Sequence, residues 1–327
     1  MINALVLIPE KHWNQEIFKK YETNYNFIIT EHPTDDQLEQ AEVIIGEPKI
    51  EQISKCKNLK WIQVSFAGVD YYARNKDQLS NIVLTNAIGA FGPAISEYVL
   101  AMTLSLMKKL PAYRDNQNQG VWRDLGKEDS IVGKQVLVVG AGNIGTHVAR
   151  IFQMFGCRVD GIRRKISEVN HSSQSQKKTL HNPQESFHSM SPITELDHLL
   201  LQADIVVLCL PSKKETWHIL DERRLGLMKP SSILINVGRG SLIDTEALVK
   251  VLQEERIQGA GLDVLEEEPL SPDHPLWKCK NAIITPHITG GSFGHLDVTS
   301  KLIFDILADN LERYLAGEPL KNQVNFL

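Results

Sequence analysis

Short apolar runs alternate with polar, helix-like stretches along the first part of the chain. The runs are ALVLIP, YNFIIT, AEVIIG, LKWIQVS and NIVLTNA, between Met1 and about Val83. Apolar runs of this length, separated by stretches with helical spacing, are typical of parallel strands joined by crossover helices. The pattern therefore predicts a parallel α/β sheet.

A longer helix is expected directly after this sheet. It should follow Pro93, with Ser96 and Glu97 near its start, and should stop at Pro111, since proline interrupts a helix. Its apolar side would consist of Val99, Leu100, Met102, Thr103, Leu106 and Met107. We expect this helix to cross between two domains.

A second α/β series follows the polar segment YRDNQNQGVWRDLGKEDS. Its strands are expected in QVLVVG, CRVDGI, ADIVVLCLP, SSILINVG, IQGAGLDV and NAIITPH. Six strands in this alternation are typical of a doubly wound sheet. A last helix, from Leu296 to Leu315, should end at Gly317 and pack back on the first domain.

One stretch departs from this regular alternation. Residues Lys165 to Ser191 are rich in Ser, Gln, His and Asn, with few apolar residues to bury, and are expected to form a mobile surface loop. His171, His181 and His188 lack the tight spacing of metal ligands, so we interpret them as solvated side chains.

Length and composition agree with two globular domains. The chain has 327 residues, 42% of them hydrophobic and 23% charged, and single cores stop growing at about 250 to 300 residues. Its formal net charge of −5 gives no general attraction to nucleic acid or to an anionic membrane. Neither is expected as a partner.

The chain is expected to work in the cytoplasm. MINALVLIP has no basic region before it and no cleavage site after it, so it resembles a first strand more than a signal peptide. No apolar stretch reaches the roughly 18 residues that span a bilayer. Cys56, Cys157, Cys209 and Cys279 form no CxxC pair, and we expect reduced thiols without a metal or a disulfide.

A glycine-rich turn opens the second series. Gly140, Gly142 and Gly145 form a GxGxxG pattern directly after a strand and at the start of a helix. The first glycine permits the tight turn, the second lets the backbone approach a pyrophosphate, and the third brings helix and strand close together. With Asn143 and Ile144 in the first turn of the helix, whose free N–H groups attract phosphate, the turn predicts a dinucleotide site.

The residues at the end of the next strand decide which dinucleotide is preferred. Asp160 lies at the spacing of the acidic residue that holds a ribose 2′-hydroxyl, but it falls in mid-strand and need not point toward the ribose. Arg163 and Arg164 occupy the strand's end, and guanidinium groups suit a 2′-phosphate. The sequence favours NADP(H); NAD(H) stays possible, with the two arginines in a solvated loop.

Three polar side chains come just past later strands, where open α/β sheets bind ligands. They are Arg239 in INVGRGSLIDTEAL, Glu268 in GAGLDVLEEEP and His287 in NAIITPHITGG. At these motifs, and also at QVSFAGVD, TNAIGAFGPAISEYVLA, LPSKKET, HPLWKCKNAIITPH and GEPLKNQV, the chain closely resembles the D-isomer-specific 2-hydroxyacid dehydrogenases over nearly its whole length.

The resemblance implies a catalytic group of three residues. Arg239 would clamp the carboxylate of a 2-oxo acid and polarise the oxo group, His287 would exchange a proton with its oxygen, and Glu268 would orient the imidazole. Glu266, Glu267, His218, His274 and His295 are interpreted as non-catalytic.

The resemblance also implies further ligand contacts. Phe66, Ala67 and Gly68 would form a loop whose backbone N–H groups meet the substrate carboxylate. Asp263 would lie near the nicotinamide carboxamide, although a buried Asp that supports its loop is nearly as good an interpretation. Further cofactor contacts are implied at Leu210, Pro211, Thr216, Val237 and Gly238.

The expected architecture is therefore α/β with two domains. A flavodoxin-like substrate domain would comprise residues 1–98 and 290–327, and a Rossmann dinucleotide domain would comprise residues 99–289. By the same resemblance the chain should form a homodimer through an arm that includes Tyr113, Trp122 and Leu125. Packing of this arm between the domains is the alternative.

The expected reaction is the reduction of glyoxylate, hydroxypyruvate or another short 2-oxo acid. A phosphoglycerate dehydrogenase is disfavoured because VSFAGVD lacks the arginine that would bind a substrate phosphate. A formate-type dehydrogenase is disfavoured because Glu268 supports an acid–base histidine that formate oxidation does not need. A dinucleotide-sensing regulatory protein remains the alternative from another class, although no basic or helix-turn-helix segment supports DNA contact.

Overall fold

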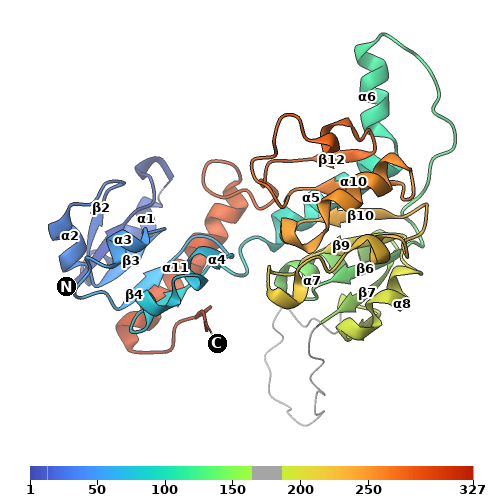
Figure 1. The fold of residues 1–327 in the computed structure, drawn as a ribbon. Helices are drawn as coiled ribbons and strands as arrows, with labels where there is room; N and C mark the ends of the chain where they lie inside the picture. The colour runs from blue at the N-terminus through green and yellow to red at the C-terminus, as the bar shows by residue number, and fades with distance from the viewer. Residues whose placement is uncertain (13, 164–185, 327) are drawn as a thin grey trace. The chain divides into compact units, whose positions relative to one another are not determined.

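The computed structural model describes residues 1–12, 14–163 and 186–326. Arg164 and most of the predicted surface loop, with His171 and His181, lie outside the described residues. The chain divides into two compact units, Met1–Phe91 with Gly291–Leu327, and Gly92–Gly290. Figure 1 labels the helices and strands of both units.

The first unit is built on a parallel sheet of five strands in its described residues, in the order β2-β1-β3-β4-β5. The strands are β1 (Ile2–Val6), β2 (Tyr25–Ile29), β3 (Val43–Ile45), β4 (Trp61–Gln63) and β5 (Val83–Thr85). Strands β2 to β5 fall within the predicted apolar runs, and β1 begins two residues before the run ALVLIP, which starts at Ala4. The strand order is that of flavodoxin-like folds, which confirms the predicted α/β class for this unit.

Helices cover both faces of this sheet. They are α1 (Gln15–Tyr21), α2 (Asp35–Gln40), α3 (Ile50–Ile53), α4 (Asp70–Ala73) and α11 (Asp297–Ala316). Side chains of α1 and α11 share one buried cluster with β1, and side chains of α2, α3 and α4 share another. The predicted end of the last helix is confirmed, since Gly317 caps α11 with φ 68°, a backbone conformation that glycine adopts readily.

The second unit has a parallel sheet of seven strands in its described residues, in the order β12-β11-β10-β9-β6-β7-β8. They are β6 (Gln135–Val139), β7 (Arg158–Ile162), β8 (Ser189–Ser191), β9 (Ile205–Leu208), β10 (Ile233–Asn236), β11 (Gly259–Leu262) and β12 (Ala282–Ile284). Counted from β6, the order begins 3-2-1-4-5-6, the doubly wound arrangement of dinucleotide-binding folds, and it reverses direction between β6 and β9.

Strand β8 corrects the sequence prediction of an uninterrupted surface loop from Lys165 to Ser191. Ser189 pairs with Asp160 of β7, and Phe187 is buried close to Gly161, where a side chain on that glycine would collide with the phenyl ring. A short strand with a single buried aromatic next to it carries too little hydrophobic periodicity to be recognised in a polar stretch.

Helices again cover both faces of the second sheet (Figure 1). They are α5 (Gly92–Met107), α6 (Leu110–Asn118), α7 (Asn143–Met154), α8 (Leu196–Leu200), α9 (Glu222–Leu225) and α10 (Thr245–Gln253). Helices α8, α9 and α10 bury leucines in one core cluster with the strands, while α5 packs against α7, β10 and β11. No helix among the described residues has the length and apolar character needed to cross a membrane.

The prediction that Pro111 ends the long helix is wrong. Helix α5 ends at Met107, and Lys109 then takes a left-handed backbone conformation with φ 54°. Pro111 lies in the first turn of α6, a position that proline tolerates because the backbone N–H groups there have no partner within the helix.

Candidate active site

The glycine-rich turn joins β6 to α7 at the point where the strand order reverses. Gly140 has φ 114°, and a Cβ atom there would lie 2.8 Å from the carbonyl carbon of Cys209, which follows β9. A Cβ atom on Gly145 would lie 2.2 Å from the Gly140 oxygen. Both glycines are therefore required by the packing of the protein itself, in the roles expected of a GxGxxG turn.

Gly142 differs from these two glycines. Its backbone is extended, with φ −92° and ψ −154°, and a Cβ atom would meet no protein atom within 4 Å. Space is left beside the helix start, next to the first-turn residues Asn143 and Ile144, whose N–H groups precede the hydrogen-bond ladder of α7. The turn thus fits a bound pyrophosphate, which would rest on the helix N-terminus in that space.

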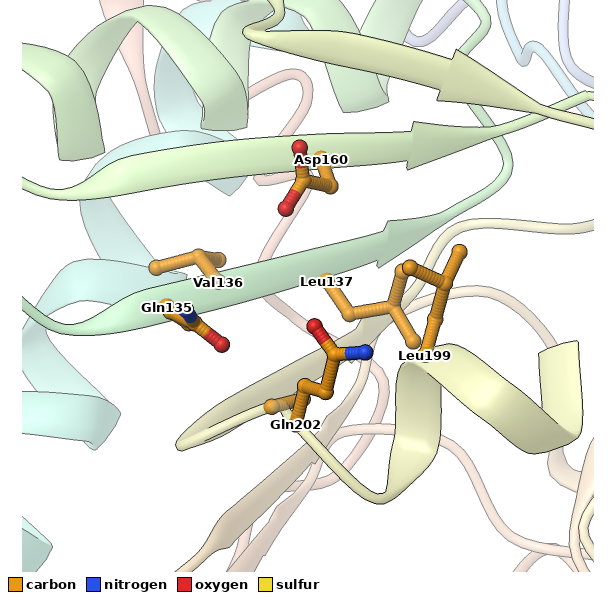
Figure 2. A pocket seen from close by; sticks show the side chains of 7 residues that line it. Gln135, Val136, Leu137, Asp160, Leu199 and Gln202 are labelled. Carbon is orange, nitrogen blue, oxygen red and sulfur yellow. The ribbon is translucent and has the colours of Figure 1, made fainter. Parts of the chain in front are cut away.

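The residues at the end of β7 bear on the choice of dinucleotide. Asp160 lies in mid-strand, and its carboxylate accepts a 2.6 Å hydrogen bond from Ser189 Oγ. Figure 2 shows this side chain facing a hollow that Leu137, Leu199 and Gln202 also line, between the strands and α8. Arg163 lies just past the strand end and is exposed, with its backbone N–H donating to Ser191 O.

Arg239 lies in the loop that follows β10. Its Nη1 donates a 2.7 Å hydrogen bond to the oxygen of Gly238, and its side chain is partly buried. Gly240 is required on the other side, because a Cβ atom there would lie 1.8 Å from the carbonyl carbon of Leu265. A Cβ atom on Gly238 would lie 2.7 Å from the oxygen of Leu210, in the loop that follows β9. The two glycines thus let the arginine loop lie directly against the loops that follow β9 and β11.

Glu268 and His287 form a hydrogen-bonded pair. Glu268 Oε2 lies 2.8 Å from His287 Nδ1, and Glu268 Oε1 accepts a 2.9 Å hydrogen bond from Leu265 N. The imidazole side chain is 53% exposed, so it remains accessible to a ligand. An ionised carboxylate on Nδ1 fixes the ring orientation and leaves Nε2 for proton exchange.

Asp263 organises the loop that carries the histidine. Its buried carboxylate accepts hydrogen bonds from Thr285 Oγ1, Ile288 N, Thr289 N and Thr289 Oγ1, at 2.6 to 3.1 Å. His287 in this loop has φ 55°, a conformation that costs energy for a non-glycine residue and persists where the surroundings hold it. The observed contacts correspond to the loop-supporting interpretation of Asp263; contact with a carboxamide stays a prediction.

The structure brings most of the predicted ligand residues to one edge of the second sheet. Arg239, Glu268 and His287 follow β10, β11 and β12, which are neighbours and parallel. The predicted cofactor residues follow the same strands or their neighbours β6, β7 and β9: Gly140, Gly142, Asn143, Ile144, Gly145, Arg163, Leu210, Pro211, Thr216, Val237, Gly238 and Asp263. Carboxyl ends of parallel strands are where open α/β sheets bind ligands.

The predicted substrate loop belongs to the first unit. Phe66, Ala67 and Gly68 follow β4, and the carbonyl oxygens of Phe66 and Ala67 accept hydrogen bonds from Ala87 N and Asn86 Nδ2. These bonds fix the loop through its carbonyl groups. Contact of its N–H groups with a substrate carboxylate, which the family resemblance implies, stays a prediction.

A second imidazole–carboxylate pair lies in the same unit as the three catalytic candidates, and sequence reasoning misses it. His218 Nε2 lies 2.6 Å from Glu266 Oε1, and both side chains are partly buried. Glu266 is thus a hydrogen-bonded polar side chain, and its interpretation as non-catalytic stays a prediction. The only signal in the sequence is that His218 follows β9 and Glu266 follows β11. A lone histidine in a loop does not show which residue it contacts, and here the partner is 48 positions away.

The fold and this strand-end site together define a nicotinamide-dinucleotide oxidoreductase. The family model described as "D-isomer specific 2-hydroxyacid dehydrogenase, NAD binding domain" matches residues 100–289. The chain belongs to the D-isomer-specific 2-hydroxyacid dehydrogenase family, as the sequence motifs indicated, and it catalyses hydride transfer between a nicotinamide dinucleotide and a 2-oxo or D-2-hydroxy acid.

Individual relatives agree with this assignment. The chain is 33% identical to a glyoxylate reductase of Thermococcus gammatolerans over 252 residues, which cover 75% of this chain and 70% of the relative. It is 30% identical to a glyoxylate/hydroxypyruvate reductase of Arabidopsis thaliana, over 87% of this chain and 83% of the relative. The crystal structure of a D-isomer-specific 2-hydroxyacid dehydrogenase family protein from Aeromonas salmonicida superposes with a TM-score of 0.82 at 29% identity, covering 100% of this chain and 99% of the other.

Proposed function

We propose that the protein reduces glyoxylate, hydroxypyruvate or a similarly short 2-oxo acid to the hydroxy acid. The observation that carries the proposal is the 2.8 Å contact between His287 Nδ1 and Glu268 Oε2. Glu268 follows β11, the strand next to β10, and Arg239 follows β10. Similarity to glyoxylate reductases supports the substrate class. The loop VSFAGVD adds support, because it offers no arginine to a substrate phosphate.

In this proposal the chain's own residues bind the substrate and transfer the proton. Arg239 binds the substrate carboxylate through its planar fork and draws electron density from the oxo group. His287 Nε2 donates a proton to the oxo oxygen as that oxygen gains negative charge, while Glu268 stabilises the imidazolium before transfer. The reduced nicotinamide, when bound, supplies the hydride to the carbonyl carbon. In the oxidative direction Nε2 takes the proton back.

We propose NADP(H) as the preferred dinucleotide. The exposed Arg163 just past β7 supports this choice, because a guanidinium group suits a 2′-phosphate. The position of Asp160 supports it too, since its carboxylate accepts a hydrogen bond from Ser189 in mid-strand and does not extend from the strand end toward a ribose.

We further propose a homodimer that works in the cytoplasm. The arm after α6 is tied down by Lys109 Nζ, which donates to Leu125 O, and by Leu125 N, which donates to Tyr113 Oη. It nevertheless leaves Trp122 with a relative exposure of 103%. An indole so exposed on an ordered arm supports a partner surface. Free thiols at all four cysteines agree with a reducing compartment.

The test is a panel of 2-oxo acids with both coenzymes, followed by the loss of nicotinamide absorbance. Glyoxylate or hydroxypyruvate with NADPH should give the highest kcat/KM. Tight dinucleotide binding without turnover of any acid would overturn the proposal in favour of a dinucleotide-sensing regulator. Preference for 3-phosphohydroxypyruvate would instead indicate a phosphoglycerate dehydrogenase, and equal efficiency with NADH would overturn the coenzyme assignment.

A further inference from the structure

The pair formed by His218 and Glu266 joins three strand-end loops of the second unit. His218 follows β9, and its backbone N–H donates a 2.8 Å hydrogen bond to Ser241 O, in the loop after β10. Its imidazole lies 2.6 Å from Glu266, in the loop after β11. The other Glu266 oxygen accepts a 2.9 Å hydrogen bond from Thr245 N, at the start of α10. We call these two side chains the strand-end clamp.

Further contacts strengthen the same junction. Ser212 Oγ lies 2.9 Å from Ser241 Oγ, and Leu220 forms a bridge with Ile243. Residue 218 itself has φ 46°, a conformation held by contacts rather than by the histidine's own preference. The indole of Trp217 stacks on the imidazole, with ring centroids 4.8 Å apart. The loop after β9 is thus fixed to its neighbours at several points.

The electrostatics of Glu266 agree with a charged role. Its burial alone would raise its pKa, but the hydrogen bonds from His218 and Thr245 outweigh burial and lower the pKa below its usual range. The carboxylate therefore stays ionised near neutrality. An ionised carboxylate that is one-quarter exposed holds a hydrogen-bond donor more strongly than a neutral acceptor does.

The clamp is adjacent to two of the three groups of the proposed mechanism. Ser241 is two residues from Arg239, and Glu266 is two residues from Glu268. The loops that carry these groups touch where Gly240 lies against the backbone of Leu265, and Leu265 N donates to Glu268. Movement of either loop would therefore shift the guanidinium and the carboxylate relative to each other.

We propose that His218 and Glu266 are positioning residues, which hold the arginine loop and the Glu268 loop in the arrangement that the reaction requires. The inference rests on the proposed function, because it assigns the clamp a task only through Arg239 and Glu268. Neither clamp residue is a proton donor to substrate in this scheme; both act on the geometry of groups that are.

The test compares His218→Ala, His218→Gln and Glu266→Gln with the matched control His198→Ala. His198 is an exposed histidine of α8 whose ring nitrogen lies 2.7 Å from Gln202 Nε2, away from the strand-end loops. Loss of the clamp should lower kcat/KM for the 2-oxo acid by about 10- to 100-fold, because small displacements of catalytic groups are this costly. The fall should lie mainly in kcat, with the Kd of the dinucleotide changed less than about twofold.

Rescue separates positioning from a general loss of structure. Glutamine at position 218 carries an amide donor with about the reach of Nε2, so His218→Gln should recover most of the activity that His218→Ala loses. The double variant His218→Ala/Glu266→Gln should lose no more activity than the worse single variant, since both substitutions act on the same imidazole–carboxylate contact. Activity of His218→Ala within about twofold of wild type, or no rescue by glutamine, would overturn the inference.

A second measurement keeps this result apart from failure of the proposed function. Hydrogen exchange of the segments 239–242 and 265–268 should be faster in folded His218→Ala than in wild type and His198→Ala. If wild type turned over no 2-oxo acid, the proposed function would fail, and unchanged exchange would still count against the clamp. Should His218→Ala not fold, Glu266→Gln carries the same comparison.

Discussion

At the scale of single residues, the site depends on conformations that the surrounding bonds impose. His287 holds φ 55° because Asp263 binds the loop around it through Thr285, Ile288 and Thr289. A strained backbone of this kind is stable only where several contacts determine it together. The imidazole is thereby fixed at the carboxylate of Glu268 before any ligand binds, which lowers the cost of ordering it during the reaction.

His287→Gln should lose most turnover while keeping the fold and the dinucleotide. Glutamine can accept or donate a hydrogen bond but cannot transfer a proton at neutral pH, and general acid catalysis contributes about 10²- to 10⁴-fold in rate. We expect kcat to fall within that range and the Kd for NADPH to stay within about twofold, measured by steady-state kinetics and by fluorescence titration. A nearly unchanged kcat would show that another group supplies the proton.

Single residues were predictable where their neighbours constrain them strongly. Arg239 stands between two glycines after an apolar strand, and such a setting leaves few interpretations. Glu266 stands in a run of three glutamates, which resembles a solvated surface segment. Its contact with His218 depends on how two distant loops pack, and that information is absent from local sequence.

At the scale of elements, glycines decide how closely loops and helices approach one another. Glycines at or just after the strand ends differ in what a Cβ atom on them would meet. At Gly140, Gly145 and Gly240 a Cβ atom would lie within 3 Å of protein backbone, whereas at Gly142 it would enter open space. The first three glycines are required by the packing of the fold, and the space beside Gly142 is open to a ligand.

Gly142→Ala and Gly240→Ala should therefore fail in opposite ways. The methyl group at 142 meets no protein atom, so the free energy of unfolding should change by less than about 0.5 kcal/mol. It would project toward the phosphates, and the Kd for the dinucleotide should rise by about 10-fold or more. At position 240 the methyl group would collide with the Leu265 backbone, so the free energy of unfolding should fall by about 1 to 3 kcal/mol or more.

Chemical denaturation and dinucleotide titration of both variants make the comparison. A Gly142→Ala protein that binds NADPH as tightly as wild type would show that the pyrophosphate does not occupy the space beside the helix start. In that case the glycine pattern would be a feature of the turn alone.

The hydrophobic pattern of the sequence predicted where most strands and helices lie, but it predicted their ends less reliably. The buried strands of both sheets lie inside the predicted apolar runs or overlap them, because a continuous apolar run is the direct consequence of burial on both faces. The division of one expected helix into α5 and α6 depends on the left-handed backbone conformation of Lys109 between them. A lysine in the sequence does not predict that conformation. Strand β8 is similarly hidden, since it is short and polar.

At the scale of the whole molecule, two doubly wound units share one construction rule. Each has a parallel sheet with helices on both faces, and the chain returns to the first unit through its last segment. Alternation of strands and helices predicted this architecture because parallel strands require crossover connections. What alternation does not predict is association with a second chain, since that depends on the surface.

The arm that follows α6 carries the most exposed large hydrophobic side chain among the described residues. Figure 1 shows α6 and the extended segment after it standing clear of the sheet of their unit. Trp122 lies in this segment, fully exposed. Buried tryptophans are frequent anchors of protein interfaces, and losing one commonly costs about 2 kcal/mol or more of association free energy.

Trp122→Glu should therefore weaken the proposed homodimer by about 30-fold or more in Kd, because 1.4 kcal/mol corresponds to about a factor of ten. Met154→Glu is the matched control, since Met154 is an apolar residue of the same unit with 85% exposure at the end of α7, outside the arm. Sedimentation over a range of protein concentrations should show wild type and the control as dimers where Trp122→Glu is largely monomeric. A wild-type protein that sediments as a monomer throughout would instead mean that the indole is exposed for another reason, and equal weakening in both variants would place the interface elsewhere.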